Sequence, residues 1–385
     1  MNSEYPYPIA KIGLIGGGQL GRMTVEAAKK IGCECIVLDP TEGSPAGQIA
    51  KKQIIGSHHD EEKINQLALE ADLITFELEN INTEALQKLE NQGYKIFPSP
   101  SVLRTIQDKL TQKKFLKSHK IPSADFLPID TPSIEFFKGF GFPLVQKVRM
   151  GGYDGQGVVV IESEEEFKKH INKKSLIERF IKAKKEIAII VARSISGEIK
   201  TFPPVEMSVR PGENILDMLL APANISEKLK IEAENIAKKT VEALQGIGVF
   251  GIEMFIDQNE KILVNEIAPR PHNSGHHTIE ANITNQFEQH LRAILDLPLG
   301  STETLIPAVM VNLFGAADES GPPILRGLNE VLKIPGIHLH LYGKATTRPF
   351  RKMGHITILD ADMSVAKAKA VKVRQTIEIG SEREK

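Results

Sequence analysis

The chain has 385 residues, of which 41% are hydrophobic and 25% are charged, and its formal net charge at pH 7 is -1. Since a single domain often has ~150 residues, this length predicts two or three domains. The near-zero charge gives no reason to expect nucleic acid or an anionic membrane as a partner. No apolar run approaches the ~20 residues that span a bilayer, and the first ten residues lack the regions of a signal peptide. We therefore expect a cytoplasmic protein.

The first hundred residues alternate between strand-like and helix-like segments. Strands are predicted at residues 11–16, 34–39, 72–77 and 94–99, and helices at residues 19–31, 61–71 and 82–92. Strands that alternate with helices predict a parallel, doubly wound sheet. We assign residues 1–105 to this Rossmann-like N-terminal domain.

A glycine-rich turn follows the first of these strands. Gly16, Gly18 and Gly21 fit the G-x-G-x-x-G pattern, and Asp39 ends the next strand, where a dinucleotide site has its ribose-binding acid. The turn by itself therefore suggests an NAD-dependent oxidoreductase. No evident residues for hydride transfer accompany it, so a different ligand for the same turn stays open.

The texture of the sequence changes at about residue 105. A lysine-rich helix is predicted at 108–119, followed by short strands around one helix at 163–172, with strands at 175–181, 186–197 and 198–207. This order predicts an α+β unit with an antiparallel lid at about 122–204. A long helix at 226–246 and a hairpin at 248–270 complete a second domain, which we place at residues 106–303. Residues 304–385 are predicted to form a small β-rich domain.

Two acidic residues lie on the two strands of that hairpin. Glu253 stands between Ile252 and Met254, and Glu266 follows Asn265. Carboxylates on adjacent strands can face each other and present the oxygen ligands that Mg²⁺ prefers, and Asn265 would add a neutral oxygen. An exposed sheet face with two solvated acids is the alternative, although acids within apolar strands usually need partners.

Two further segments are typical of a nucleotide site. Lys147 ends an apolar strand and precedes a separate glycine-rich loop at residues 150–157, the flap, where backbone N–H groups can contact phosphates. Glu178, Phe180 and Ile181 end a later strand that can receive an adenine through its backbone, and Glu186 could hold the ribose hydroxyls. Taken alone, the first segment is more commonly an ordinary turn, and the second also fits a simple amphipathic hairpin.

These features occur in an order that resembles the ATP-grasp enzymes. The strings GGYDG and EIAPRPHNSGHHT make the chain similar to the N5-carboxyaminoimidazole ribonucleotide synthetase family of purine biosynthesis, from GGGQLGRM near the start to RKMGH near the end. RPHNSGH is highly specific, whereas the glycine loops are not. The resemblance implies a mixed α/β and α+β fold, with a Rossmann-like pre-ATP-grasp domain, an ATP-grasp domain and a small β-rich C-terminal domain.

The resemblance also implies an activity. Such enzymes use ATP, Mg²⁺ (or Mn²⁺) and bicarbonate to carboxylate 5-aminoimidazole ribonucleotide, through carboxyphosphate, and the family implies a homodimer. Another ATP-grasp carboxylate–amine ligase, such as the formate-dependent glycinamide ribonucleotide transformylase, is the main alternative. A third is a non-catalytic ATP-grasp-like binding protein.

The site residues that the resemblance implies fall into four groups. Glu253 and Glu266 would bind the metal. Arg270 would clamp a planar carbonate while His272 and Asn273 donate to its oxygens, although His272 could equally be structural. Substrate would be bound by Gln19, Leu20, Glu77, Glu79, Tyr153, Ser274, Lys344 and Arg351, the last two at the 5′-phosphate with Arg348 and Lys352 as helpers. ATP would be bound by Arg104, Lys109, Lys147, Gly152, Tyr153, Asp154, Gly155, Gln156, Gly157, Glu178, Arg179, Phe180, Ile181, Glu186, Asn265 and Glu266.

The chain departs from the family pattern at four positions. Gln156 and Met150 stand where family members often have basic or polar residues. Met207 and Val209 replace the Asn and His of a usual EN-x-H string. The resemblance therefore does not extend to a contact of the flap, the glycine-rich loop at 150–157, with substrate or of the missing histidine with ATP, while the residues expected to bind metal and carboxyphosphate are present.

Overall fold

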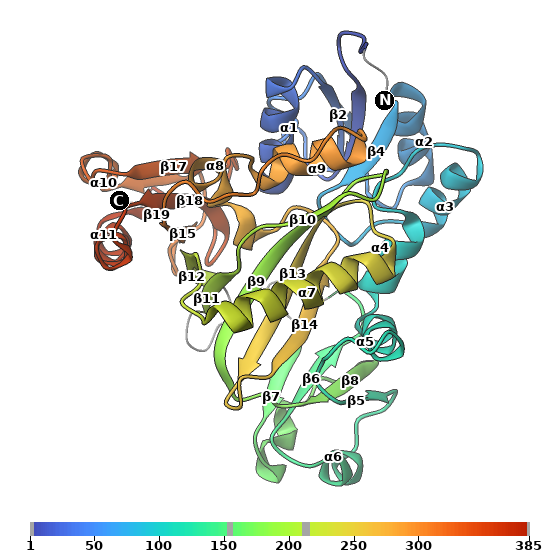
Figure 1. Cartoon of the computed structure of the whole chain (residues 1–385), viewed down its shortest axis with the longest axis vertical. Helices are drawn as coiled ribbons and strands as arrows, with labels where there is room; N and C mark the ends of the chain where they lie inside the picture. Colours follow the sequence, from blue (N-terminus) through green and yellow to red (C-terminus); the bar gives the residue numbers. More distant parts are fainter. Residues whose placement is uncertain (1–3, 152–156, 210–215, 383–385) are drawn as a thin grey trace.

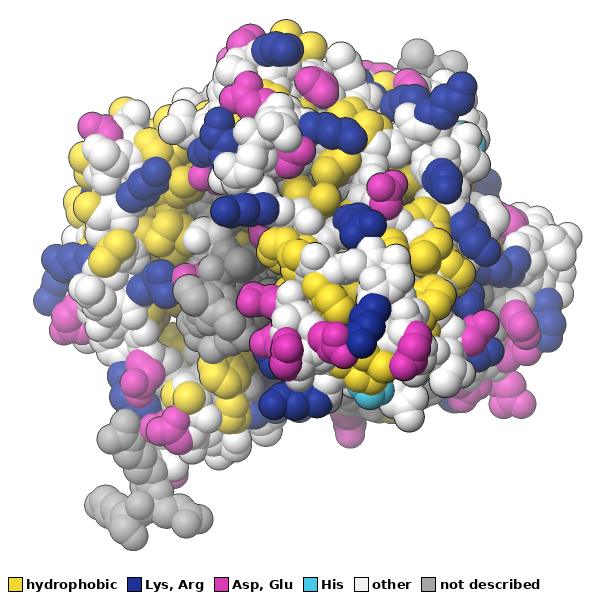
Figure 2. Space-filling model, turned by 90° about the horizontal axis from the view of Figure 1, so that it is seen from below, with side chains coloured by type: hydrophobic (Ala, Val, Ile, Leu, Met, Phe, Trp, Pro, Cys, Tyr) yellow, Lys and Arg dark blue, Asp and Glu magenta, His cyan; other side chains and the backbone are white. Residues whose placement is uncertain are grey.

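A computed structural model describes residues 4–151, 157–209 and 216–382 of the chain. Figure 1 shows the N-terminal sheet at the top, a long central sheet below it, a small antiparallel sheet at the lower end and the C-terminal elements at the left. None of the helices in the described ranges is long and apolar enough to cross a membrane. On the face seen in Figure 2, acidic and basic side chains are interspersed, in keeping with the net charge of -1.

The N-terminal sheet is parallel throughout, in the order β3-β2-β1-β4. Its strands are β1 (Lys11–Ile15), β2 (Glu34–Asp39), β3 (Lys52–Ile55) and β4 (Leu73–Phe76), and its helices are α1 (Gln19–Lys30), α2 (Glu61–Glu70), α3 (Thr83–Asn91) and α4 (Pro100–Gln107). One apolar cluster packs α1 on one face of the sheet and another packs α2 and α3 on the other face. Asp60 and Asn82 accept backbone N–H groups at the starts of α2 and α3. The predicted Rossmann-like fold is confirmed.

The lid sheet is antiparallel, in the order β5-β8-β6-β7. Its elements are β5 (Phe126–Ile129), α6 (Ile134–Phe140), β6 (Leu144–Val148), β7 (Val158–Ile161), the 3-10 helix η1 (Glu164–Lys169) and β8 (Ser175–Arg179), and α5 (Lys109–Ser118) precedes them. The helix predicted at 163–172 is present only as the shorter 3-10 helix η1, which buries no residue. A short segment with so little apolar surface has no stripe to hold a full α-helix on the sheet.

The central sheet has the order β14-β13-β9-β11-β12, continued by β15-β18-β17, with β10 beside β9. Its first strands are β9 (Ala183–Arg193), β10 (Ile199–Thr201), β11 (Val205–Val209), β12 (Leu216–Ala221), β13 (Gly248–Asp257) and β14 (Ile262–Ala268), and α7 (Glu227–Leu244) covers one face. The strand predicted at 198–207 is split into β10 and β11, because Pro203 and Pro204 lack the N–H groups that a ladder requires.

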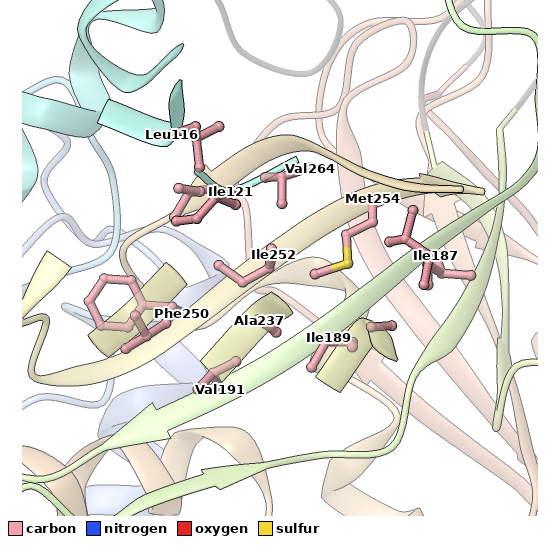
Figure 3. Close-up of a cluster of buried hydrophobic side chains, with 14 of the residues drawn as sticks. Leu116, Ile121, Ile187, Ile189, Val191, Ala237, Phe250, Ile252, Met254 and Val264 are labelled. Carbon is pink, nitrogen blue, oxygen red and sulfur yellow. The ribbon is translucent and has the colours of Figure 1, made fainter. Parts of the chain in front are cut away.

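Side-chain alternation separates the core of the central sheet from its open face. The core shown in Figure 3 places alternate residues of β9 and β13 against α7, namely Ile187, Ile189, Val191, Phe250, Ile252 and Met254, with Ala237 of the helix. Successive residues of a strand point to opposite faces, so Glu186 and Glu253 lie on the face away from α7. Burial of the apolar face therefore fixes the orientation of both acids.

The C-terminal strands extend the same sheet. β15 (Ala308–Phe314) pairs with β12 and with β18 (Lys352–Leu359), and β18 pairs with β17 (Ile337–Leu341). The remaining elements are η2 (Asn273–Gly275), α8 (Thr278–Ala281), α9 (Gln286–Ile294), β16 (Ile324–Arg326), α10 (Leu328–Leu332), α11 (Met363–Thr376) and β19 (Glu378–Gly380). Phe287 and Leu291 of α9 join the apolar cluster of α1, which fixes the N-terminal sheet to the rest of the molecule.

Candidate functional site

The hairpin β13–β14 places Glu253 directly opposite Glu266. Met254 pairs with Val264, so Asn265 is an extra residue in β14, a β-bulge. Without the bulge, Glu266 would point to the same face as Val264, which is buried in the core under α7. The bulge shifts the alternation by one residue and brings Glu266 to the face of Glu253.

The two carboxylates have different electrostatic surroundings. Burial, together with the nearby charges of Glu266 and Glu186, raises the pKa of Glu253 to about 7. Burial acts on Glu266 too, but the ammonium of Lys109, with Nζ 2.6 Å from Glu266 Oε1, outweighs it and lowers the pKa of Glu266. Three acids on one face therefore repel each other, and a divalent cation between Glu253 and Glu266 would relieve that repulsion.

A buried cluster of two lysines and one glutamate lies beside the acids. Lys147 Nζ of β6 is 3.1 Å from Glu178 Oε2 of β8 and donates to Asn265 Oδ1 at 2.9 Å. Lys113 Nζ of α5 is 3.2 Å from the same oxygen of Glu178. The cluster carries one net positive charge at the junction of the lid sheet and the central sheet, where an anionic phosphate would be stabilised. We refer to this junction, together with Glu253 and Glu266, as the cleft.

The expected adenine and ribose residues border this cleft unevenly. Phe180 is 40% exposed after the end of β8, while the guanidinium of Arg179 lies over the ring of Phe140, 4.6 Å from its centroid. Burial raises the pKa of Glu186. Met207 pairs with Glu186 across the β9–β11 ladder and offers it no strong hydrogen-bond donor.

The loop after β14 brings further polar groups toward Glu253. Arg270 Nη2 is 2.8 Å from Glu79 Oε1, and His272 Nε2 is 3.5 Å from Glu253 Oε1. His272 Nδ1 lies 2.8 Å from Ser274 Oγ, and Gln286 fixes the His272 backbone through its N–H and C=O. The ring of His272 is therefore held between Ser274 and a metal-candidate carboxylate.

Asn273 differs from its neighbours in this loop. Both polar atoms of its side-chain amide are buried and have no hydrogen-bond partner within the described parts of the chain. Leaving a buried amide unsatisfied is unfavourable, so such a group is typical of a site that binds a polar ligand.

In the glycine-rich turn at residues 16–21, backbone N–H groups donate hydrogen bonds to carboxylates of the protein itself. Glu77 accepts hydrogen bonds from the Gly18 and Gly21 N–H groups at 2.5 and 2.8 Å, and Asp39 accepts one from the Gly17 N–H at 2.8 Å. These are the N–H groups that hold the pyrophosphate in a dinucleotide-binding turn. The structure thus commits Glu77 to the turn, which leaves Glu79 as the other of the two acids predicted to bind substrate.

The C-terminal cations lie near the same end of the molecule. The side-chain amide of Gln48, from the loop after β2, donates to the C=O groups of both Gly43 and Gly343 at 2.9 and 2.7 Å. Lys344 follows Gly343 and donates to the C=O of Lys352 at 2.6 Å, and Arg351 donates to the C=O of Thr346 at 2.7 Å. Burial and the charge of Arg348 lower the pKa of Arg351. The structure therefore brings the Lys344 loop next to the N-terminal domain.

Several residues that the sequence predicts for the site take no part in the contacts described above. Arg104 is exposed on α4, Gln19 begins α1 and is partly exposed, and Leu20 is buried in the α1 cluster. Gly157 has a φ of +79°, and its C=O accepts from the Val148 N–H at 2.8 Å. Gly152, Tyr153, Asp154, Gly155 and Gln156 lie outside the described residues.

Sequence reasoning missed Lys113. It stands four residues after Lys109, so both side chains project from one face of α5. That spacing was the available signal, but the helix carries other lysines with nothing in the sequence to separate them from Lys113.

Family models match three consecutive parts of the chain. The ribonucleotide synthetase preATP-grasp domain matches residues 9–107, the ATP-grasp domain residues 114–287, and the phosphoribosylaminoimidazole carboxylase C-terminal domain residues 308–369. The phosphoribosylaminoimidazole carboxylase of Schizosaccharomyces pombe is 41% identical, over 90% of this chain and 64% of its own length. The chain thus spans about two thirds of the length of such fungal relatives.

Bacterial relatives and solved structures match over nearly their whole length. The N5-carboxyaminoimidazole ribonucleotide synthase of Bacillus subtilis is 38% identical, over 93% of this chain and 94% of that protein. The crystal structure of the Thermotoga maritima synthetase has a TM-score of 0.91 at 50% identity, covering 97% of this chain and 100% of that one. An Aspergillus clavatus synthase in complex with ADP and 5-aminoimidazole ribonucleotide has a TM-score of 0.88 at 34% identity, covering 95% and 98%. The chain belongs to the N5-carboxyaminoimidazole ribonucleotide synthase family of ATP-grasp enzymes.

Proposed function

We propose that this chain carboxylates the exocyclic amine of 5-aminoimidazole ribonucleotide with bicarbonate at the expense of ATP, in purine biosynthesis. The observation that carries the proposal is the pairing of Glu253 with Glu266 beside Lys109, Lys147 and the loop of Arg270. Such a set can bind a metal, a nucleotide phosphate and a carbonate within one cleft. ATP-grasp relatives solved with ATP, and with ADP and the ribonucleotide, support the same ligands here.

The metal would be Mg²⁺ or Mn²⁺ held by Glu253 and Glu266, with Asn265 as a neutral oxygen. The raised pKa of Glu253 supports a bound cation at this position. It arises from burial and from the charges of Glu266 and Glu186, which the nearby lysine does not offset and a metal ion would. When bound, the cation would neutralise charge on the transferred phosphoryl group. In this scheme Lys109 gives up its ion pair with Glu266, which then binds the metal, and contacts the phosphates instead. Lys147 also binds phosphate.

Carbonate chemistry is assigned to the loop after β14. Bicarbonate attacks the γ-phosphorus of ATP to give carboxyphosphate and ADP, and Arg270 orients the planar carbonate through parallel N–H groups. Arg270 is held by Glu79 in the structure and is therefore already aimed at the carboxyl end of β4. The buried amide of Asn273 would donate to oxygen atoms on which negative charge develops, and His272 would act with it.

The ribonucleotide would lie between the N-terminal domain and the C-terminal cations. Lys344 and Arg351 would bind its 5′-phosphate, with Ser274, Gln19 and Leu20 along its edge and Tyr153 covering it. The link from Gln48 to Gly343 supports this location, because it ties the Lys344 loop to the N-terminal domain. Glu79 is a better candidate than Glu77 for the aminoimidazole, since Glu77 already serves the glycine-rich turn.

Four further features belong to the proposal. They are a homodimer formed through the N-terminal domain, a cytoplasmic location, bicarbonate as the carbon source, and domain boundaries at 1–105, 106–303 and 304–385. The continuous ladder from β12 to β15 makes the last boundary one of chain order rather than of separate sheets. Light scattering on the purified chain would test the dimer.

The activity is tested by incubating the chain with ATP, Mg²⁺, bicarbonate and aminoimidazole ribonucleotide while ADP release is followed. We expect ADP release that depends on both bicarbonate and the ribonucleotide. Formate-dependent turnover of glycinamide ribonucleotide, without any turnover of bicarbonate, would instead establish the transformylase alternative. No turnover in either mixture, with ADP still bound, would favour a binding protein.

A further inference from the structure

Lys113 is a buried lysine in the nucleotide cleft with no role in the scheme above. It is 2% exposed, on the face of α5 that also carries Lys109. Lys109 pairs with Glu266 of the central sheet, whereas Lys113 pairs with Glu178 of the lid sheet. One helix thus contributes a cation to each wall of the cleft.

Glu178 depends on lysines for its charge. It is 3% exposed, and its Oε2 lies 3.2 Å from Lys113 Nζ and 3.1 Å from Lys147 Nζ. Its other oxygen, Oε1, is buried without a hydrogen-bond partner among the described residues. Although burial would raise the pKa of this carboxyl, the two ammonium groups hold it below its ordinary value, so Glu178 is an anion that requires a counter-ion.

Binding of a nucleotide makes competing demands on Lys147. In the structure, Lys147 divides its ammonium between Glu178 and Asn265. When Lys147 contacts a phosphate it gives up part of its pairing with Glu178, and a buried carboxylate left without any cation would be strongly unfavourable. Lys113 contacts the same oxygen of Glu178 from α5, is almost fully buried, and forms no second ion pair among the described residues.

We infer that Lys113 is a positioning residue for nucleotide binding, which stays on Glu178 as its counter-ion and so releases Lys147 to bind a phosphate. This inference rests on the proposed function only in that a nucleotide occupies the cleft. Burial, reinforced by the charge of Lys147, lowers the pKa of Lys113 to about 8, and the carboxylate of Glu178 acts against that shift. Lys113 is thus suited to pair with an anion rather than to remain charged alone.

The inference is tested by calorimetric titration of ADP with Mg²⁺ into the full chain and four variants: Lys113→Met, Lys114→Met, Glu178→Gln and the double variant Lys113→Met/Glu178→Gln. In Lys113→Met, Lys147 becomes the sole partner of Glu178, and we expect the Kd for ADP to rise at least about tenfold. Lys114→Met, which alters an exposed lysine on the same helix, should leave the Kd within about twofold. In steady-state kinetics the KM for ATP should rise more than kcat falls.

A double variant separates this role from simple packing. In Lys113→Met/Glu178→Gln the carboxylate is removed together with its counter-ion, so the Kd for ADP should return to within about threefold of that of Glu178→Gln alone. A loss in the double variant equal to the product of the two single losses would overturn the inference, as would an unchanged Kd in Lys113→Met. Circular dichroism and thermal unfolding of each variant show that the comparison is made between folded proteins.

The outcome also separates this inference from the proposed function. ADP binding that follows the predicted pattern, in a chain that does not carboxylate aminoimidazole ribonucleotide, overturns the reaction and supports the role of Lys113. Failure of the unmodified chain to bind ADP with Mg²⁺ overturns both.

Discussion

Two regions of this molecule have polar groups suited to binding phosphate. In one region these groups are paired with other groups of the protein, and in the other they are not all paired. In the glycine-rich turn, the backbone N–H groups of Gly17, Gly18 and Gly21 donate hydrogen bonds to Asp39 and Glu77 of the same domain. In the cleft of the central sheet, carboxylates face each other and a buried amide has no partner in the described chain. The turn is closed by internal contacts, whereas the cleft retains charge and hydrogen-bonding capacity for a ligand.

This difference shows why a motif alone is a poor guide to a ligand. A dinucleotide at the glycine-rich turn would have to displace a buried carboxylate that accepts two hydrogen bonds, and its phosphates would then repel that carboxylate. In the cleft, a metal and a nucleotide would instead offset charges that the protein leaves uncompensated. The state of the polar groups, rather than the presence of glycines, separates a structural turn from a binding site.

The largest effect is expected for Glu266→Gln in the cleft. The change removes one of two candidate metal carboxylates and the partner of Lys109, so bicarbonate-dependent turnover should fall by at least about 10²-fold. ADP release in the complete reaction mixture is the measurement. The exposed Glu242→Gln on α7 serves as the control and should keep full activity. Retained turnover in Glu266→Gln would remove the metal assignment.

The turn should respond in stability rather than in chemistry. Glu77→Gln replaces two charge-assisted hydrogen bonds with an amide that presents an N–H₂ group to an N–H donor, and we expect a loss of about 2 kcal/mol in the free energy of unfolding. Urea unfolding measures it. Glu79→Gln should change stability by less than about 1 kcal/mol, because Glu79 is partly exposed, but should lower turnover by loosening Arg270. The reverse pattern would contradict our division of the two acids.

Much of this contrast was accessible from the sequence, but not all of it. Strand periodicity predicted the parallel sheet and the hairpin, and the acids within apolar strands identified Glu253 and Glu266. The bulge at Asn265 was not predicted, because a one-residue shift of register depends on which side chains the core accepts.

The hydrogen bonds of Glu77 to the glycine-rich turn could not be predicted from the sequence either. Two acids in the string TFELEN look equivalent, and only the approach of β4 to the glycine-rich turn separates one that serves the turn from one that pairs with Arg270. Likewise, the C-terminal strands read as a separate module, because the ladder between β12 and β15 joins segments far apart in the chain.

Asn273→Ala tests whether the cleft is organised for a ligand rather than for the fold. The amide makes no hydrogen bond within the described chain, so its removal should change the free energy of unfolding by less than about 0.5 kcal/mol. Turnover should nevertheless fall about tenfold, because a donor to the carbonate oxygens is lost. Denaturant unfolding and bicarbonate-dependent ADP release on the same preparation give both values. A large loss of stability would instead assign Asn273 to the fold.

The smallest effect concerns His290, which joins the two regions. Its Nδ1 accepts from the Val249 N–H of β13 at 3.0 Å, and its Nε2 lies 2.8 Å from Thr75 Oγ1 of β4. Burial lowers the pKa of His290 from 6.5 to about 3. Between these values the unfolded chain binds a proton that the folded chain does not, so the free energy of unfolding falls as the pH falls below about 6.5.

Replacing His290 should therefore flatten the acid side of the stability profile. In His290→Asn, the loss of unfolding free energy between pH 7.5 and 5.5 should be smaller by about 1 kcal/mol than in the unmodified chain, even though the variant is less stable at every pH. Urea unfolding at both pH values measures the difference. His119→Asn, at an exposed histidine, is measured alongside as the matched variant. If both variants keep the original dependence of unfolding free energy on pH, His290 is not the neutral histidine that links β4 to β13. Other buried histidines then account for the acid sensitivity, such as His277, whose pKa burial lowers to about 4.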